Sequence, residues 1–238
     1  YLSMALRYFG VTKGDSVAIL SENRPEWFIS DIGIQSMGFV SVGMYPTNPP
    51  SEVQYLLSHS ESKILFAEDQ EQVDKALEVI DDLPGLDKII YFEERGLYNY
   101  DHPKLMNFYE FLQIGESEYN AYPIVVDEQL DAIQDDEIAF LVYTSGTTGP
   151  PKGSMISHGN IKWVGSQIPN FSLVESLTAT NPQFLSYLPL CHIFGRLTDL
   201  LIATHTLATI NFAESIDTVQ MDLVEIQPTI FPAVPRIL

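Results

Sequence analysis

Short runs of β-branched and aromatic residues recur along the first part of this 238-residue chain, each followed by a stretch that can form a helix. The runs cover residues 17–20, 39–45, 63–67 and 88–92, at intervals of roughly twenty residues. Strands joined by crossover helices must run parallel, and a parallel sheet needs helices on its faces. The alternation therefore predicts an α/β fold with an open, doubly wound parallel sheet flanked by helices.

Two of the intervening stretches carry helix signals. In residues 24–36, Pro25 suits a first turn and Gly38 a C-terminal stop, while apolar residues on more than one side indicate a well-buried helix. Further on, Ser51 could cap the next helix. Three apolar residues of that helix are expected to point inward: Val53, Leu56 and Leu57.

The rest of the chain divides into an acidic middle and a second regular portion. Residues 93–136, with a short helical pattern near 106–114, are interpreted as an irregular surface connection. We therefore divide the chain into a first α/β portion, residues 1–136, and a second portion, residues 137–238, in which the parallel-sheet rhythm resumes. The second portion is expected to contain helices at 160–167, 195–203 and 216–226 and strands at 138–143, 184–188 and 207–212.

Composition narrows the classes of function. The 32 Asp and Glu residues outnumber the 12 Lys and Arg residues, and the formal charge of −20 argues against a nucleic-acid-binding surface. The single cysteine, Cys191, cannot form an intrachain disulfide, which fits a reducing compartment such as the cytoplasm. No transmembrane helix is expected, because Pro, Gly, Asn and Ser interrupt the longest uncharged runs. Any phosphate site must therefore be built locally.

Residues 143–153 form the segment that is most informative about chemistry. They follow the apolar strand at 138–143, so the segment lies at the carboxyl end of a strand, where open α/β sheets bind ligands. Gly146 and Gly149 allow successive amide N–H groups to face one anion, and Lys152 adds a positive charge. Four hydroxyl groups can donate to phosphate oxygens: those of Thr144, Ser145, Thr147 and Thr148.

A Walker-type loop is excluded for this segment. Such a loop needs adjacent Gly and Lys followed by Ser or Thr, whereas two prolines separate Gly149 from Lys152, and Gly153 follows. A polar surface turn remains the alternative for any few of these residues. The full run of eleven residues instead favours a loop that binds a polyphosphate.

Residues 143–153 resemble the signature phosphate loop of the adenylate-forming superfamily, which includes acyl-CoA ligases, luciferases and peptide-synthetase adenylation domains. The resemblance continues at residues 14–27, at 45–47 followed by 55–57, and at 187–196. Residues 228–231 with 234–236 resemble the corresponding segment of long-chain acyl-CoA ligases in particular. Nearly the whole chain is covered, and the acidic middle is least characteristic. By this resemblance the chain is an incomplete N-terminal AMP-binding domain without the family's C-terminal domain.

The resemblance implies that a fatty acid carboxylate attacks ATP to give an acyl-adenylate, from which coenzyme A accepts the acyl group. ATP, magnesium and coenzyme A are the implied co-substrates. The implied catalytic residues are Thr144, Lys152 and His192, with Thr144 also a magnesium ligand. The implied ligands of the ATP phosphates are Thr144, Ser145, Gly146, Thr147, Thr148, Gly149 and Lys152.

His192 would lie between the adenylate and the acyl carboxylate, unless it only satisfies a backbone group at a helix start. His59, His102, His158 and His205 show no metal-ligand spacing and are interpreted as structural. Arg236 is undecided between a role in the site and a salt bridge.

Alternatives to the CoA ligase stay open at this point. A fatty acyl-AMP ligase that passes acyl groups to a carrier protein, or an aryl or amino acid activator, would share these motifs. A non-catalytic nucleotide-binding module would keep the loop without turnover. The family's magnesium glutamate, ribose-binding aspartate and C-terminal lysine have no counterpart in this chain, so the fragment itself is expected to be inactive. The acidic sequence does not support membrane association. Acyl-chain length and oligomeric state are not predicted.

Overall fold

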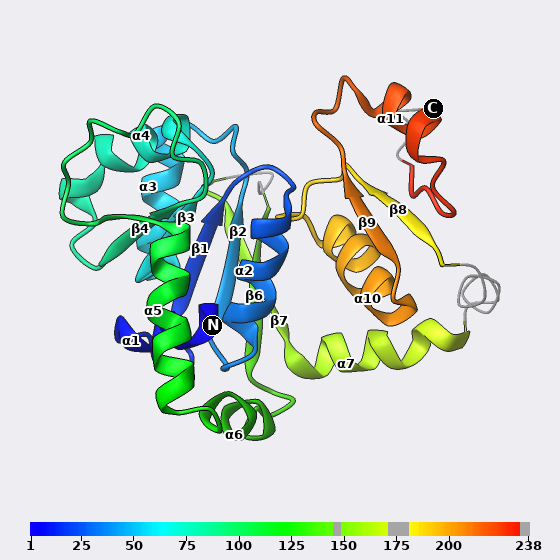
Figure 1. Cartoon of the computed structure of the whole chain (residues 1–238), viewed down its shortest axis with the longest axis horizontal. Coiled ribbons are helices and arrows are strands. Elements are labelled where there is room, and N and C mark those ends of the chain that lie inside the picture. The colour runs from blue at the N-terminus through cyan, green and yellow to red at the C-terminus, as the bar shows by residue number, and fades with distance from the viewer. Residues whose placement is uncertain (145–148, 171–180, 234–238) are drawn as a thin grey trace. The chain divides into compact units, whose positions relative to one another are not determined.

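A computed structural model describes residues 1–144, 149–170 and 181–233 of the chain. The chain forms two compact units (Figure 1). The first comprises Tyr1–Glu22 and Glu26–Gly159, and the second comprises Asn23–Pro25 and Asn160–Leu238. Each unit has its own sheet.

The sheet of the first unit is the expected open, mostly parallel sheet. Within the described residues it has seven strands in the order β5-β4-β3-β1-β2-β6-β7. Each neighbouring pair is parallel except the edge pair, in which β7 runs antiparallel to β6. The strands are β1 (Ser16–Leu20), β2 (Val40–Met44), β3 (Ile64–Ala67), β4 (Lys88–Tyr91), β5 (Leu105–Asn107), β6 (Ile138–Thr144) and β7 (Lys152–Ser157). Because β6 pairs with β2, this sheet contains residues from both sides of position 136/137, and the division of the chain there stays a prediction.

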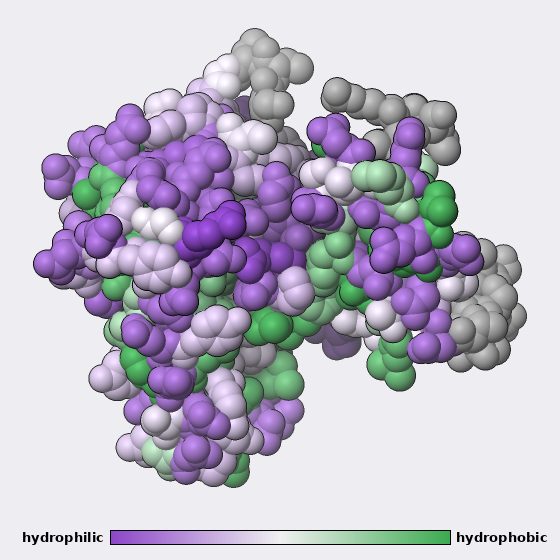
Figure 2. Space-filling view, turned by 45° about the horizontal axis from the view of Figure 1, so that its top comes forward, coloured by the Kyte–Doolittle hydropathy of each residue, from purple (hydrophilic) through white to green (hydrophobic). Residues whose placement is uncertain are grey.

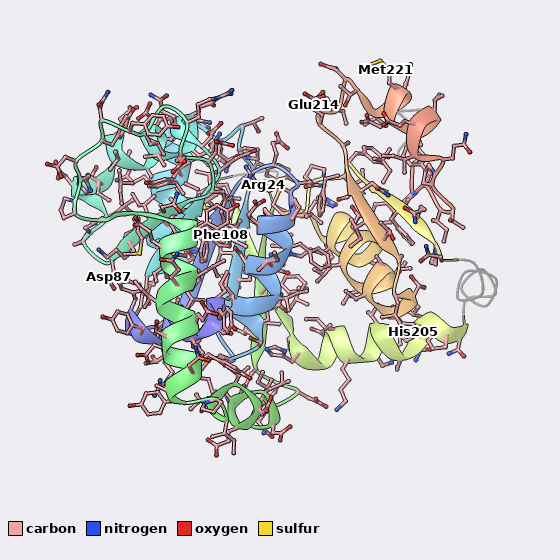
Figure 3. The ribbon with its side chains drawn as sticks, in the orientation of Figure 1. Arg24, Asp87, Phe108, His205, Glu214 and Met221 are labelled. Atoms are coloured by element: carbon pink, nitrogen blue, oxygen red, sulfur yellow. The ribbon has the colours of Figure 1, made fainter. Side chains whose placement is uncertain are left out.

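Helices cover both faces of this sheet, as a doubly wound fold requires. Leu65 and Phe66 are neighbours on β3 and therefore point to opposite faces. Leu65 belongs to the apolar cluster under α3 and α4, whereas the ring of Phe66 contacts Phe108 and Phe111 of α5. Phe108 lies at the start of α5 (Figure 3). The helical segments of this unit are α1 (Leu2–Tyr8), α2 (Pro25–Gln35), α3 (Pro50–His59), α4 (Gln70–Glu78), the short 3-10 turn Ile80–Asp82, α5 (Phe108–Ala121) and α6 (Val125–Asp131).

The prediction of an irregular connection at residues 93–136 is wrong. This region contains β5, the 14-residue helix α5, whose N-cap Asn107 accepts a hydrogen bond from the N–H of Tyr109, and α6. The helix buries a narrow stripe of Phe108, Phe111 and Gly115. Gly115 allows close packing on α1, since a Cβ atom there would lie 2.1 Å from the carbonyl oxygen of Tyr1.

The predicted helix between the first two strands is confirmed as α2, with Gly38 at φ +72° behind its end. Its expected burial on more than one side is wrong. Trp27 and Ile34 are buried, but Ile29 and Ile32 are 49% and 44% exposed. The buried face also holds a carboxylate, Asp31, which accepts hydrogen bonds from side chains of β2 and of α2 itself.

The expected cap of α3 is also wrong. Pro49 occupies the N-cap position and Pro50 begins the helix, so Ser51 lies within the first turn. The fixed φ of proline suits the first helical position, where no N–H partner is needed. The three apolar residues predicted to face inward are buried: Val53, Leu56 and Leu57.

The second unit continues the predicted alternation of helices and strands. Its sheet, within the described residues, pairs β8 (Gln183–Ser186) in parallel with β9 (Thr209–Phe212). Its helical segments are α7 (His158–Gln167), the 3-10 turn Ile168–Asn170, α9 (Ile193–Gly195), the π-helical turn Arg196–Ile202, α10 (Ala203–Thr206) and α11 (Val219–Ile226). In the described part of the chain, no helix has the length and apolarity needed to cross a membrane.

Candidate functional site

The phosphate-loop segment joins β6 to β7, and we call residues 143–144 with 152–153 the loop stem. Thr144, the last residue of β6, pairs with Lys152, the first residue of β7. One step further from the loop, Tyr143 pairs with Gly153. Both Thr144 and Lys152 are exposed. The two strands thus hold a hydroxyl and an ammonium group side by side at the carboxyl end of β6, the edge at which α/β sheets bind ligands.

The tip of the loop is only partly described. The expected phosphate ligands Ser145, Gly146, Thr147 and Thr148 lie outside the described residues. Gly149 has φ +91°, a left-handed backbone conformation that glycine adopts without strain, and a Cβ atom there would meet nothing within 4 Å.

Helix α3 contacts one strand of the loop stem and the residue directly before the other strand. The hydroxyl of Tyr55 donates a hydrogen bond to the carbonyl oxygen of Pro151 at 2.9 Å. Nδ1 of His59 lies 2.8 Å from the hydroxyl oxygen of Tyr143. Burial, and then the neighbouring Tyr55, raise the pKa of Tyr143 to about 12, so this phenol keeps its proton at neutral pH. Sequence reasoning missed both α3 residues and interpreted His59 only as structural. Their i, i+4 spacing, which places them on one helix face, is the signal that could have grouped them.

Ion pairs with carboxylates neutralise the charges of two other lysines in the first unit, Lys13 and Lys63. Nζ of Lys13 lies 2.8 Å from a carboxylate oxygen of Glu137, and Nζ of Lys63 lies 2.6 Å from one of Asp15. Hydrophilic side chains dominate the face of this unit seen in Figure 2. In such an acidic chain, any phosphate site would depend on local cations and amide groups, because salt screens the overall field.

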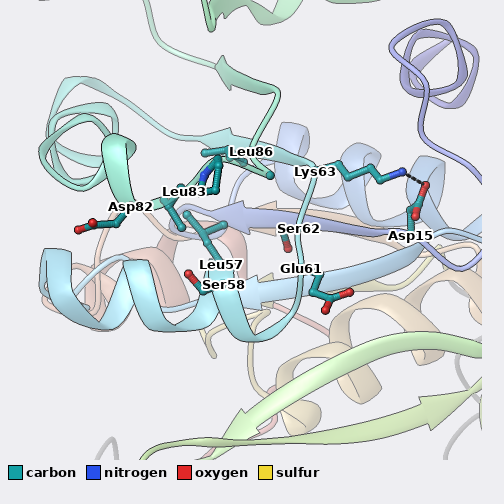
Figure 4. A pocket seen from close by; sticks show the side chains of 11 residues that line it. Asp15, Leu57, Ser58, Glu61, Ser62, Lys63, Asp82, Leu83 and Leu86 are labelled. Atoms are coloured by element: carbon teal, nitrogen blue, oxygen red, sulfur yellow. Dashed lines mark hydrogen bonds and ion pairs between the residues drawn. The ribbon is translucent and has the colours of Figure 1, made fainter.

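One concave region lies at the opposite edge of the sheet. A pocket of about 530 Å³ is lined by residues that precede β1, β3 and β4, which is the amino edge (Figure 4). Its lysine, Lys63, is paired with Asp15, and Glu61 and Asp82 add further negative charge. A triphosphate would be repelled there, so we do not assign the nucleotide site to this pocket.

The described residues contain no group of three or more His, Cys, Asp or Glu side chains that could hold a metal ion. Magnesium in nucleotide sites is often bound by few protein oxygens and by the phosphates themselves. The exposed hydroxyl of Thr144 fits this pattern, because it would be the protein's ligand to a magnesium ion that is otherwise bound by phosphate oxygens.

In the second unit, His192 is the N-cap of α9. Its Nδ1 accepts a hydrogen bond from the N–H of Phe194 at 3.1 Å. This nitrogen therefore satisfies a backbone group at the helix start, which was the alternative to a role in binding. The neutral ring must then carry its proton on Nε2. Because the side chain is exposed, Nε2–H is a donor that a ligand could use.

The turn before His192 is fixed by two residues that sequence reasoning did not single out for this role. The side chain of Asn23 donates to the carbonyl oxygen of Leu188 at 2.8 Å and accepts from the N–H of Leu190 at 3.0 Å. Gly195 leaves room for the turn, since a Cβ atom there would lie 2.5 Å from the carbonyl oxygen of Pro189.

Two charged side chains are buried just after this turn. Arg196 and Asp199 are 1% and 2% exposed, and both lie in the π-helical turn. Burial raises the pKa of Asp199 to about 6, against smaller opposing effects of hydrogen bonds with Ser186 and Thr198. Cys191, the single cysteine of the chain, is buried, and Arg236 lies outside the described residues.

Known proteins are similar to this chain along its whole length. The model of the family described as "AMP-binding enzyme" matches residues 1–238. Long-chain-fatty-acid–CoA ligase ACSBG2 of Xenopus laevis is 34% identical over 235 residues, and the ligase ACSBG1 of Homo sapiens is 34% identical over 239. Each match covers 96% of this chain but 31% of the relative, so the chain spans about a third of these relatives' length.

Solved structures share the fold at lower identity. The anthranilate CoA ligase AuaEII in complex with anthranoyl-AMP matches 97% of this chain and 42% of its own with a TM-score of 0.73 and 24% identity. ATP-bound MatB from Rhodopseudomonas palustris matches 99% of this chain and 42% of its own with a TM-score of 0.75 and 19% identity. These likenesses support the fold.

Proposed function

The chain belongs to the AMP-binding enzyme family, and from that premise we propose that it forms the ATP-phosphate-binding part of a long-chain fatty acid CoA ligase. The observation that carries the proposal is the loop stem, in which Thr144 and Lys152 pair across β6 and β7 and are both exposed. Its place at the carboxyl edge of a parallel sheet, and the similarity to long-chain-fatty-acid–CoA ligases, support the assignment.

The proposed reaction has two steps. A carboxylate oxygen of the fatty acid attacks the α-phosphorus of ATP, the bond from that phosphorus to the bridging oxygen breaks, and pyrophosphate leaves. The thiolate sulfur of coenzyme A then attacks the acyl carbon, and AMP leaves with the electrons of the acyl–oxygen bond. Two anions must meet in the first step, so the protein acts mainly by alignment and electrostatic stabilisation.

In this proposal, Lys152 neutralises the phosphate tail of ATP. The amides and hydroxyls of Ser145, Gly146, Thr147, Thr148 and Gly149 surround the same oxygens. Magnesium, when bound with ATP, would supply further positive charge to the phosphates, with Thr144 as one oxygen ligand. His192 donates through Nε2–H to the adenylate or to the acyl carboxylate, because its Nδ1 is engaged with Phe194. The single cysteine, Cys191, cannot form an intrachain disulfide, which is consistent with the cytoplasm as the compartment.

The test uses the full-length protein that contains this segment and measures pyrophosphate released from ATP. We expect release that depends on a long-chain fatty acid, and formation of acyl-CoA when coenzyme A is added. The 238-residue chain alone should release none. Acyl-adenylate that coenzyme A cannot discharge would instead support transfer to a carrier protein. No fatty-acid-dependent release from the full-length protein would support a non-catalytic nucleotide-binding module.

A further inference from the structure

Tyr55 and His59 lie on the same face of α3, one helical turn apart. Their rings stack with a centroid separation of 5.3 Å and an interplanar angle of 30°. Stacked rings restrict each other's rotation, so the two polar atoms at their tips are held in fixed directions. Nδ1 of His59 reaches the loop stem at Tyr143, and the hydroxyl of Tyr55 reaches Pro151, the residue next to the stem.

One contact falls on the β6 side of the stem and the other on the residue that directly precedes β7. Tyr55 donates to the carbonyl of Pro151, the residue directly before Lys152. His59 contacts the hydroxyl of Tyr143, the residue directly before Thr144. One helix therefore contacts the chain next to both candidate phosphate ligands.

The packing around Tyr143 makes the arrangement tight. Tyr143 is 8% exposed and belongs to the apolar cluster that includes Leu56 and Leu57 of α3. Its ring also lies over Gly153 in the opposite strand, where a Cβ atom would approach to 3.2 Å. The edge of the His59 ring meets the Tyr143 ring at a centroid distance of 5.7 Å and an angle of 80°. The stem therefore cannot shift along α3 without breaking hydrogen bonds in a partly buried environment.

We propose that Tyr55 and His59 are positioning residues, which hold the loop stem so that Lys152 and Thr144 stand where the ATP phosphates bind. The proposal rests on the proposed function, because it assigns the stem to the triphosphate. Neither residue touches phosphate in this account. Their effect reaches ATP through backbone position, on which electrostatic stabilisation depends steeply.

The test compares four variants of the full-length protein. Tyr55→Phe removes one hydroxyl and keeps the stacked ring, and His59→Ala removes the imidazole. His59→Asn is the conservative variant, because its amide oxygen can accept from Tyr143 near the place of Nδ1. The matched control is Tyr100→Phe, which removes a hydroxyl that donates to Asp74 at 2.7 Å, away from the stem.

Two readouts separate the stem contact from the reaction. The first is amide hydrogen exchange in peptides that cover residues 140–144 and 151–157. The second is the KM for ATP and for fatty acid in pyrophosphate release. Tyr55→Phe and His59→Ala should speed exchange in these peptides and raise the KM for ATP roughly three- to tenfold, as loss of one ordinary hydrogen bond predicts. The KM for fatty acid should stay unchanged in both variants. His59→Asn should keep exchange and the KM for ATP close to the wild-type values, and Tyr100→Phe should change neither readout.

Each alternative outcome has a distinct meaning. Unchanged exchange in both stem peptides would overturn the contact itself, whether or not the protein uses ATP. Faster exchange with an unchanged KM for ATP would overturn the positioning role and leave the proposed function standing. Faster exchange in the variants, together with no pyrophosphate release by the wild-type protein, would overturn the proposed function, and with it the assignment of the stem to ATP.

Discussion

At the scale of single residues, the second unit buries two charged side chains, those of Arg196 and Asp199. Asp199 is 2% exposed, and its Oδ2 has no hydrogen-bond partner among the described residues. Burial penalises the charged form and raises the pKa of this carboxyl to about 6. Retaining an ionisable group there costs stability at neutral pH, which indicates that the position is not set by stability alone.

This shift predicts a pH dependence. The pKa of Asp199 is raised above its unfolded value, so its contribution to stability is fully present below about pH 4 and is lost as the pH rises through about 6. The neutral isostere in Asp199→Asn should therefore stabilise the chain at neutral pH, on the order of 1–3 kcal/mol, and by less near pH 5. Urea unfolding at the two pH values measures the difference. A variant less stable than the wild type at neutral pH would contradict this account.

At the scale of elements, the turn before α9 depends on close backbone approach at Gly195. A Cβ atom there would lie 2.5 Å from the carbonyl oxygen of Pro189 and 2.8 Å from that of Leu188. Backbone atoms cannot rotate away as a side chain can. The same backbone presents His192, so the fit of this glycine also fixes the direction of the imidazole.

We therefore expect Gly195→Ala to destabilise the second unit by about 1–3 kcal/mol. The matched control is Gly165→Ala in α7, where a Cβ atom would meet nothing within 4 Å. That change should stabilise by about 0.5–1 kcal/mol, because alanine favours the helix. Thermal unfolding and limited proteolysis compare the two variants. Equal effects of both substitutions would show that the contact with Pro189 does not matter.

The same elements show what sequence can and cannot predict. Periodicity was sufficient for the parallel sheet, for α2 and for the loop at the end of β6, because each is a local pattern. Helix α5 was predicted only as a short helical pattern near residues 106–114, since its buried stripe of Phe108, Phe111 and Gly115 is narrow within an acidic segment. The contacts of α3 with the stem were missed because their partners lie 84 and 96 residues apart. The residues of the loop tip, from Ser145 to Thr148, lie outside the described residues, and their role stays a prediction.

At the scale of the whole molecule, an acidic chain is proposed to bind a highly charged anion. With 32 acidic against 12 basic residues, long-range attraction cannot bring ATP to the protein. The binding must come from short-range contacts at the loop. The chain spans 31% of the length of these relatives and contains this part of the proposed site, and the two-step reaction stays a proposal.

The most direct test of the central claim compares the affinities of the full-length protein for ATP and AMP when Lys152 is neutralised. Lys152→Gln should weaken ATP binding roughly ten- to a hundredfold, the range for a hydrogen bond to a charged group, and should leave AMP binding within about twofold. Lys88→Gln, at the start of β4, makes the same charge change and should affect neither nucleotide. Unchanged ATP affinity in Lys152→Gln, or equal weakening of ATP and AMP, would contradict the account.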